Sequence, residues 1–159
     1  EGVVKCVFRA RDAIEAHIEK QLKKKGELPQ TDRFYAVGGA WRAIASLDME
    51  LNNYGLRVLQ SYTIPAERVI ELCDLICDFK KRPESLIKST TGKRFATLHY
   101  TALTLKKVIQ ASGTKEMVTS AYGLREGIVF DGMDAETRMI DPLLAGVSIL
   151  ARANQPYYA

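Results

Sequence analysis

Residues 34–45, FYAVGGAWRAIA, decide the fold that the sequence predicts. A short apolar run, too short for a helix, is followed at once by Gly38 and Gly39 and then by a helical pattern from residue 40 to about residue 53. Continuous apolar runs of this length are typical of buried strands, and glycine permits the tight turn that must follow. The stretch therefore predicts a strand, a glycine turn and a helix, which is the unit from which α/β domains are built.

The same alternation of strand and helix patterns continues along the chain. Further strands are predicted over 57–64 and 116–121, with a basic linker between Pro83 and Gly92. Parallel strands need helical crossovers, so the alternation predicts an α/β fold with a mostly parallel sheet. We expect one domain over 1–134 and a helical extension over 135–159. Apolar periodicity predicts the other helices over 10–25, 65–80, 95–112, 124–130 and 135–153, the last divided near Asp141 and Pro142.

The composition is that of a folded domain. Of 159 residues, 47% are hydrophobic and 26% are charged, which excludes disorder and collagen-like repeats. No run approaches the roughly 18 consecutive apolar residues of a membrane span, and no signal peptide is recognisable. We therefore expect a cytoplasmic protein. Because the chain opens at Glu1 without a methionine, we also expect a processed protein or a piece of a longer one.

Patterns that bind metals are weak. Cys6, Cys73 and Cys77 lack the Cys-x-x-Cys spacing of zinc sites, and free cysteines of this kind are typical of a reducing compartment. Three acidic residues between 131 and 136 miss the spacing of a calcium loop, so we interpret them as turn and cap residues. The sequence predicts no metal ligand in this chain.

The turn at Gly38 and Gly39 is the first candidate binding site. A strand that ends in glycines and opens a helix presents unpaired backbone N–H groups, and glycine lets a phosphate approach them closely. The pattern is neither of the familiar phosphate-binding fingerprints, so two interpretations stay open: an anion site, or a tight turn that needs only a positive φ. We interpret Trp41 as a core or interface anchor rather than a platform for stacked bases.

Positive charge is concentrated between residues 80 and 107. Such a stretch attracts a polyanion, with an affinity that falls as salt is added, but it is equally compatible with a solvated surface. Few aromatic residues are interleaved with the charges, which disfavours single-stranded nucleic acid. Against Glu84 alone, the stretch holds eight basic residues: Lys80, Lys81, Arg82, Lys88, Lys93, Arg94, Lys106 and Lys107.

A second candidate site is GLREG over 123–127. It places Arg125 at the first turn of a helix directly after a strand, at the edge of a parallel sheet where ligands bind. Arg125 could fix a phosphate or a neighbouring domain, whereas for Glu126 we favour a structural bond to backbone groups at the helix start. No nucleophile elbow or metalloprotease pattern is present. The residues by themselves thus predict an α/β domain with an anion-binding edge.

Residues 34–45 together with 123–128, GLREGI, resemble the exopolyphosphatase and guanosine pentaphosphate phosphatase (Ppx/GppA) family. The resemblance continues through 62–65 and 141–145, and so covers nearly the whole chain. It implies a ribonuclease-H-like domain of the actin-like superfamily, the second of two that close on a phosphate chain and Mg²⁺. By position, the residues that match the family are Gly38, Gly39, Trp41 and Arg42 in the first signature and Arg125, Glu126 and Gly127 in the second. The resemblance also includes Lys93 and Arg94 at the basic start of the long helix, where Arg94 matches a position that faces the polyphosphate path in the family.

The resemblance also implies an activity. Relatives release the terminal phosphate of inorganic polyphosphate, or the 5′ phosphate of guanosine pentaphosphate, but their catalytic glutamate and two phosphate loops do not occur in this sequence. We therefore expect a supporting domain, inactive by itself, whose partners are that substrate, the first actin-like domain of the same polypeptide and, in a homodimer, a second copy. The basic stretch favours polyphosphate. Ala40 stands where relatives commonly carry Thr or Ser, which removes a hydroxyl contact. The alternative is a non-catalytic module that binds a polyanion or a protein.

Overall fold

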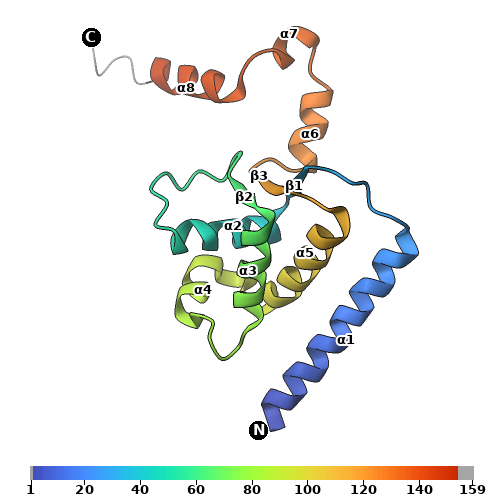
Figure 1. The fold of residues 1–159 in the computed structure, drawn as a ribbon. Coiled ribbons are helices and arrows are strands. Elements are labelled where there is room, and N and C mark those ends of the chain that lie inside the picture. The colour runs from blue at the N-terminus through green and yellow to red at the C-terminus, as the bar shows by residue number, and fades with distance from the viewer. Residues whose placement is uncertain (1, 154–159) are drawn as a thin grey trace. The chain divides into compact units, whose positions relative to one another are not determined.

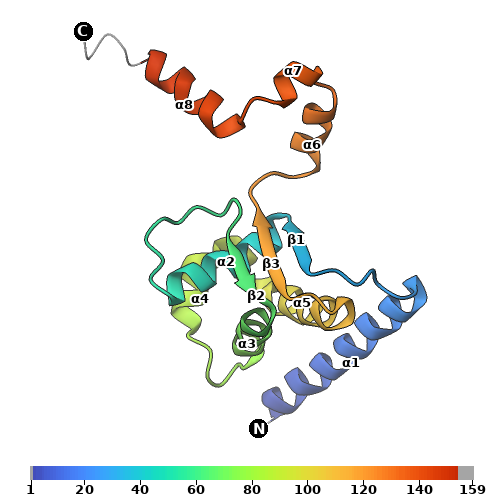
Figure 2. The ribbon, with the colours of Figure 1, turned by 45° about the horizontal axis from the view of Figure 1, so that its top comes forward.

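A three-stranded sheet forms the centre of the fold in the computed structural model, which describes the backbone of residues 2–153 and the side chains of 11–141 and 144–153. The strands are β1 (Arg33–Val37), β2 (Thr63–Pro65) and β3 (Glu116–Ser120), in the order β1-β3-β2 (Figure 2). β1 and β3 are parallel, whereas β2 runs antiparallel to β3. The sheet is therefore mixed.

Helices of the larger unit pack on one face of the sheet (Figure 1). Helices α2 and α3 pack against the strands, α5 packs against both of them, and α1 packs against α5. None of the helices within residues 2–153 has the length and apolar character that crossing a bilayer requires. In chain order the helical elements are α1 (Gly2–Lys25), α2 (Gly39–Leu51), α3 (Ala66–Cys77), α4 (Glu84–Thr91), the 3₁₀ helix η1 (Gly92–Thr97), α5 (Leu98–Ser112), α6 (Leu124–Asp131), α7 (Ala135–Arg138) and α8 (Pro142–Ala153).

Residue contacts divide the chain into two compact units, Glu1–Tyr122 and Gly123–Ala159. The first contains the sheet and helices α1 to α5, and the second contains α6 to α8. The domain boundary after residue 134 stays a prediction, and residues 154–159 of the expected helical extension lie outside the described residues.

One face of the sheet builds the core. Side chains alternate along a strand, so Ala36 of β1 is buried while Tyr35 and Val37 are 61% and 47% exposed on the other face. The covered face meets apolar side chains that recur at helical spacing on α2, α3 and α5. The largest fully buried side chains are Ile44, Leu47, Ile64, Val69, Leu72, Ile76, Ile87, Leu98, Leu105, Ile109, Met117 and Thr119.

The α/β class is confirmed, but the prediction of a mostly parallel sheet is wrong. The strand expected over 57–64 is only three residues long and antiparallel to its neighbour. Asn53, Arg57 and Ser61 all have positive φ, which is incompatible with an extended strand, so the chain forms a winding loop before it turns back into β2. The two parallel strands are therefore β1 and β3, and the chain between them contains β2 and the helices α2 to α5.

The basic linker predicted from Pro83 is also wrong, because α4 and η1 occupy that stretch. Glu84 in the first turn favours the helix start, and the buried Ile87 anchors it to the core. The long helix ends where predicted, with Gly113 in the left-handed conformation at φ 61°. The division of the final helix near Asp141 is confirmed by the separation of α7 from α8.

Candidate anion-binding site

The turn after β1 lies at the edge of the sheet where the parallel strands end. Val37, the last residue of β1, is paired with Ser120, the last residue of β3, so both strands end side by side. Gly38 has a φ of 122°, which a residue with a side chain rarely adopts, and the chain then enters α2 at Gly39. The first N–H groups of α2 have no partner within the helix, and its N-terminus carries partial positive charge.

Arg94 reaches this turn from a distant part of the chain. A Cβ atom added to Gly39 would lie 2.7 Å from Cζ of Arg94 and closer still to its Nη2. The guanidinium of Arg94 therefore lies against the first residue of α2, while the side chain as a whole is exposed. Lys93 stands beside it on η1 and is also exposed. A guanidinium and a helix N-terminus that lie together favour an anion, since a phosphate accepts hydrogen bonds from both.

Arg42 and Gln60 fix the end of β3 at the same edge. Nη1 of Arg42 donates to the carbonyl oxygen of Ala121, and the N–H of Ala121 donates to Oε1 of Gln60 at 2.8 Å. The start of α2 and the loop before β2 are thus tied to the residue that follows β3. Sequence reasoning missed Gln60, because a single polar residue in a loop carries no pattern.

Trp41 connects α2 to β1. Its ring meets Phe34 edge-on, with centroids 6.2 Å apart and planes at 90°, and it packs against the core cluster. This geometry is that of an anchor between helix and strand, the contact that aromatic pairs prefer. The anchor holds the turn, at Gly38 and Gly39, in place.

The basic stretch is not one continuous strip. Nζ of Lys106 lies 2.6 and 2.7 Å from the two carboxylate oxygens of Asp74. Nζ of Lys107 lies 2.7 Å from Oε1 of Glu19 on α1, and this bond raises the pKa of Lys107. Arg82 packs against aromatic rings. Three of the eight basic residues are therefore engaged within the fold, and the exposed ones are Lys80, Lys81, Lys88, Lys93 and Arg94.

Arg125, Glu126 and Gly127 belong to the smaller unit, and a role for them in binding stays a prediction. Oε2 of Glu126 accepts a hydrogen bond of 2.7 Å from the N–H of Gly123, which closes the start of α6. Arg125 is exposed on the first turn of the same helix.

The acidic residues between 131 and 136 and the cysteines were the other residues that the sequence analysis considered. Asp134 caps α7 by accepting a hydrogen bond of 2.7 Å from the N–H of Thr137. Hydrogen bonds from the backbone and side chain of Thr137 lower the pKa of Asp134. Cys73 and Cys77 are buried, while the side chain of Cys6 lies outside the described ones. Within the described residues, no three His, Cys, Asp or Glu side chains gather where they could hold a metal ion.

Sequence reasoning missed a buried carboxylate on α2 that connects this helix to neighbouring elements. Asp48, 2% exposed, accepts from Nε of Arg68 at 2.9 Å and from the hydroxyl of Tyr62 at 2.9 Å. Burial, and then the bond to Asp48, raises the pKa of Tyr62 to about 12. The cluster joins α2 to α3 and to the loop before β2. A lone acidic residue in a helical pattern gives no signal of such burial.

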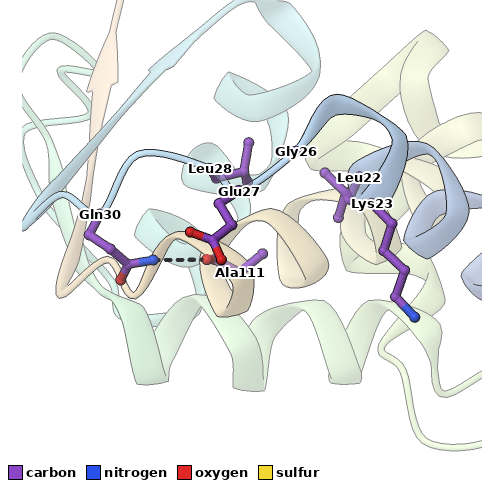
Figure 3. A pocket seen from close by; sticks show the side chains of 7 residues that line it. All are labelled: Leu22, Lys23, Gly26, Glu27, Leu28, Gln30 and Ala111. Atoms are coloured by element: carbon purple, nitrogen blue, oxygen red, sulfur yellow. Dashed lines mark hydrogen bonds between the residues drawn. The ribbon is translucent and has the colours of Figure 1, made fainter.

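A hollow of about 550 Å³ lies elsewhere in the same unit (Figure 3). Nε2 of Gln30 donates to the carbonyl oxygen of Ala111 at 3.3 Å across its floor. The hollow is bordered by the end of α1, the segment that leads into β1 and the end of α5, and none of the predicted site residues lines it. Its lining consists of Leu22, Lys23, Gly26, Glu27, Leu28, Gln30 and Ala111.

Comparison with known proteins gives both a family and a fold. A model of the Ppx/GppA phosphatase family matches residues 4–136. A crystal structure of an Aquifex aeolicus member of the Ppx/GppA family has a TM-score of 0.60 at 17% identity, covering 74% of this chain and 38% of that one. The type II variant of the Aquifex aeolicus Ppx/GppA phosphatase has a TM-score of 0.58 at 17% identity, with coverage of 80% and 41%.

A further structure, of the Aquifex aeolicus PPX-GPPA enzyme, has a TM-score of 0.56 at 19% identity and covers 72% of this chain and 38% of that one. This chain therefore spans less than half the length of the proteins it resembles. No curated protein matches it. At these identities the likeness establishes the fold.

Proposed function

The chain belongs to the Ppx/GppA phosphatase family, and from this premise we propose that it supplies the supporting domain of a phosphohydrolase. The longer enzyme releases the terminal phosphate of inorganic polyphosphate or the 5′ phosphate of guanosine pentaphosphate. The proposal extends to a ribonuclease-H-like fold of the actin-like superfamily, a cytoplasmic location, a first actin-like domain as partner and a homodimeric assembly. Family membership supports each of these points.

The observation that carries the proposal is the guanidinium of Arg94 against Gly39 at the start of α2. A phosphate placed there accepts charge-assisted hydrogen bonds from Arg94 and backbone hydrogen bonds from the helix start. The backbone donors are fixed by the turn before the ligand arrives, and the exposed guanidinium of Arg94 already lies beside them. The role proposed for this chain is to grip phosphate groups of the substrate.

In the part of the chain that the structure describes, no three His, Cys, Asp or Glu side chains gather as metal ligands, and the steps proposed for this chain use its own side chains and backbone alone. In reactions of this class Mg²⁺ neutralises charge on the phosphate oxygens. We propose that the longer enzyme uses Mg²⁺ through ligands outside this chain. The catalytic carboxylate likewise belongs, in this proposal, to the other domain.

Polyphosphate is the proposed preferred substrate, because exposed Lys80, Lys81, Lys88 and Lys93 remain available on the same part of the chain as Arg94. A linear polyanion gains affinity from each further cation that it meets, whereas a nucleotide reaches fewer of them. Competition between the two ligands for the purified chain tests this preference. Tighter binding of guanosine pentaphosphate would reverse it.

The central experiment combines turnover with binding. We expect the purified chain to release no phosphate from long-chain polyphosphate or guanosine pentaphosphate in the presence of Mg²⁺, and to bind polyphosphate. Arg94→Ala removes a charge-assisted contact and weakens binding by about tenfold or more. Lys88→Ala removes the same charge from an exposed site on α4 and serves as the matched control with a smaller effect. Sustained phosphate release, or equal losses in the two variants, would contradict the proposal.

The second candidate is a non-catalytic module that binds a polyanion or a protein, and apolar side chains on the smaller unit favour a protein partner. Leu124 and Met139 are 78% and 87% exposed, and Leu144 is 65% exposed. Large exposed apolar areas are typical of interaction surfaces. If the longer protein binds polyphosphate and never hydrolyses it, this candidate replaces the first.

A further inference from the structure

Arg82 occupies an unusual place for a residue of the basic stretch. It lies in the turn between α3 and α4, and its side chain is only 10% exposed. Cζ of Arg82 lies 4.2 Å from the ring centroid of Phe79 and 5.2 Å from that of Phe95. Nη2 lies 3.6 Å from Oε2 of Glu84. The buried Nε has no hydrogen-bond partner within the described residues. The cation is therefore held mainly by the faces of two aromatic rings.

Phe95 belongs to η1, the short 3₁₀ helix that also carries Arg94. In η1, Phe95 is the partly buried side chain, packed against the core cluster, whereas Lys93 and Arg94 are exposed. A 3₁₀ helix has three residues per turn, so consecutive side chains point in directions about 120° apart. The position of the Phe95 ring therefore sets the rotation of η1 about its own axis. This rotation decides the direction in which Arg94 points.

The contacts of Arg82 with the two rings come together with a buried donor that is unpaired among the described residues. A buried donor without a partner costs free energy, and an apolar side chain of similar size would avoid that cost. What the guanidinium adds is a preferred direction, because a cation is attracted to the face of a ring rather than to its edge. Arg82 thereby fixes the Phe95 ring relative to Phe79.

We propose that Arg82 is a positioning residue: packed between Phe79 and Phe95, it holds η1 so that the guanidinium of Arg94 lies against Gly39 and meets a phosphate there. The inference rests on the proposed function, since it assigns the support of the same anion site. Arg82 itself does not touch the ligand. Its loss leaves Arg94 in the chain but lets η1 rotate away from the glycine turn.

A double-mutant cycle tests the proposal, with long-chain inorganic polyphosphate as the probe. If η1 keeps Arg94 in place for only about a tenth of the time in Arg82→Ala, and binding without Arg94 is about tenfold weaker, the affinity falls by about fivefold. In an Arg94→Ala background the same substitution costs much less affinity, because only Lys93 of η1 is left to position. Lys81→Ala, an exposed cation of the same turn, is the matched control and weakens binding by the same small factor in both backgrounds.

Amide hydrogen exchange supplies a readout that does not depend on the ligand. We expect faster exchange over residues 92–97 in Arg82→Ala, with the core helices unchanged. Arg82→Lys keeps a cation at the rings and should restore part of both the protection and the affinity. If Arg82→Ala proves unstable, Phe95→Leu removes one ring from the other side and should reproduce the loss of affinity with an apolar side chain retained.

The failures of the two proposals are distinguishable. Equal losses from Arg82→Ala with and without Arg94, or unchanged exchange over 92–97, would overturn the positioning role and leave the anion site standing. Wild-type affinity in Arg94→Ala would overturn the anion site and the positioning role together.

Discussion

Replacing Gly39 by alanine should separate stability from binding. Gly39 does not have a positive φ, so its backbone accepts an alanine, but the added Cβ would lie 2.7 Å from Cζ of Arg94. The obstacle is the far end of a flexible, exposed side chain rather than backbone. The arginine therefore moves out while the helix stays in place.

The free energy of unfolding and the affinity for polyphosphate should not fall together. Alanine exceeds glycine in helix propensity by about 1 kcal/mol in a helix interior, and by less at the first residue, so the free energy of unfolding should be unchanged or rise by up to ~1 kcal/mol. Displacing Arg94 removes a charge-assisted hydrogen bond to phosphate worth about 1.5–3 kcal/mol. Polyphosphate affinity should therefore fall by roughly tenfold to a hundredfold.

Urea unfolding and titration calorimetry with polyphosphate measure the two quantities on the same preparation. Gly146→Ala in α8 is the matched control, because a Cβ there meets nothing within 4 Å. It should show the propensity gain without the loss of affinity. Wild-type affinity in a stable Gly39→Ala protein would refute the placement of Arg94, and a destabilisation above about 1.5 kcal/mol would refute the claim that the arginine yields.

Three further predictions concern the interior and α1. Asp48→Ala removes the acceptor of Nε of Arg68 and should cost about 2 kcal/mol. This is less than the 3–5 kcal/mol of a fully buried pair, because Arg68 is 36% exposed, reaches water and keeps its ion pair with Glu71. A hydrogen bond from Arg11, one turn earlier, is the main reason that the pKa of Glu15 lies below its ordinary 4.5. The contribution of Glu15 to stability is therefore complete above pH 4.5 and is lost as the pH falls through the lowered pKa. Amide exchange should show α1 loosening over that range. Burial raises the pKa of Cys73, and that of Cys77 to about 11, so neither thiol should react with a disulfide reagent at pH 8 until the protein unfolds.

Each of these has a control within the chain. Asp32→Asn removes a carboxylate whose side chain is 76% exposed and should not change the unfolding midpoint measurably, so an equal effect would deny Asp48 its buried role. Glu15→Gln should show the loosened α1 already at pH 7, and unchanged exchange there would exclude the proposed cause. The thiol measurement uses a Cys6→Ser background, and rapid labelling of the native protein would contradict the burial of α3.

Much of the fold was predictable because its signals are local. The glycine pair after an apolar run predicts the turn, Gly113 predicts the end of a helix, and a proline after Asp141 predicts a break. Each rests on backbone conformations that neighbouring residues allow. The loop before β2 was missed because positive φ at Asn53, Arg57 and Ser61 has no reliable signature in such residues.

The candidate site was predictable only in part. From the sequence by itself come the membership of an α/β family, the glycine turn and a supply of cations, since all three depend on residue types and short spacings. Only the tertiary structure decides that Arg94 lies against Gly39 and that Lys107 forms an ion pair with Glu19 of α1. The same is true of the position of Arg82 between aromatic rings. A side chain's partner is set by packing between elements distant in the chain, and packing has no local period for a sequence to display.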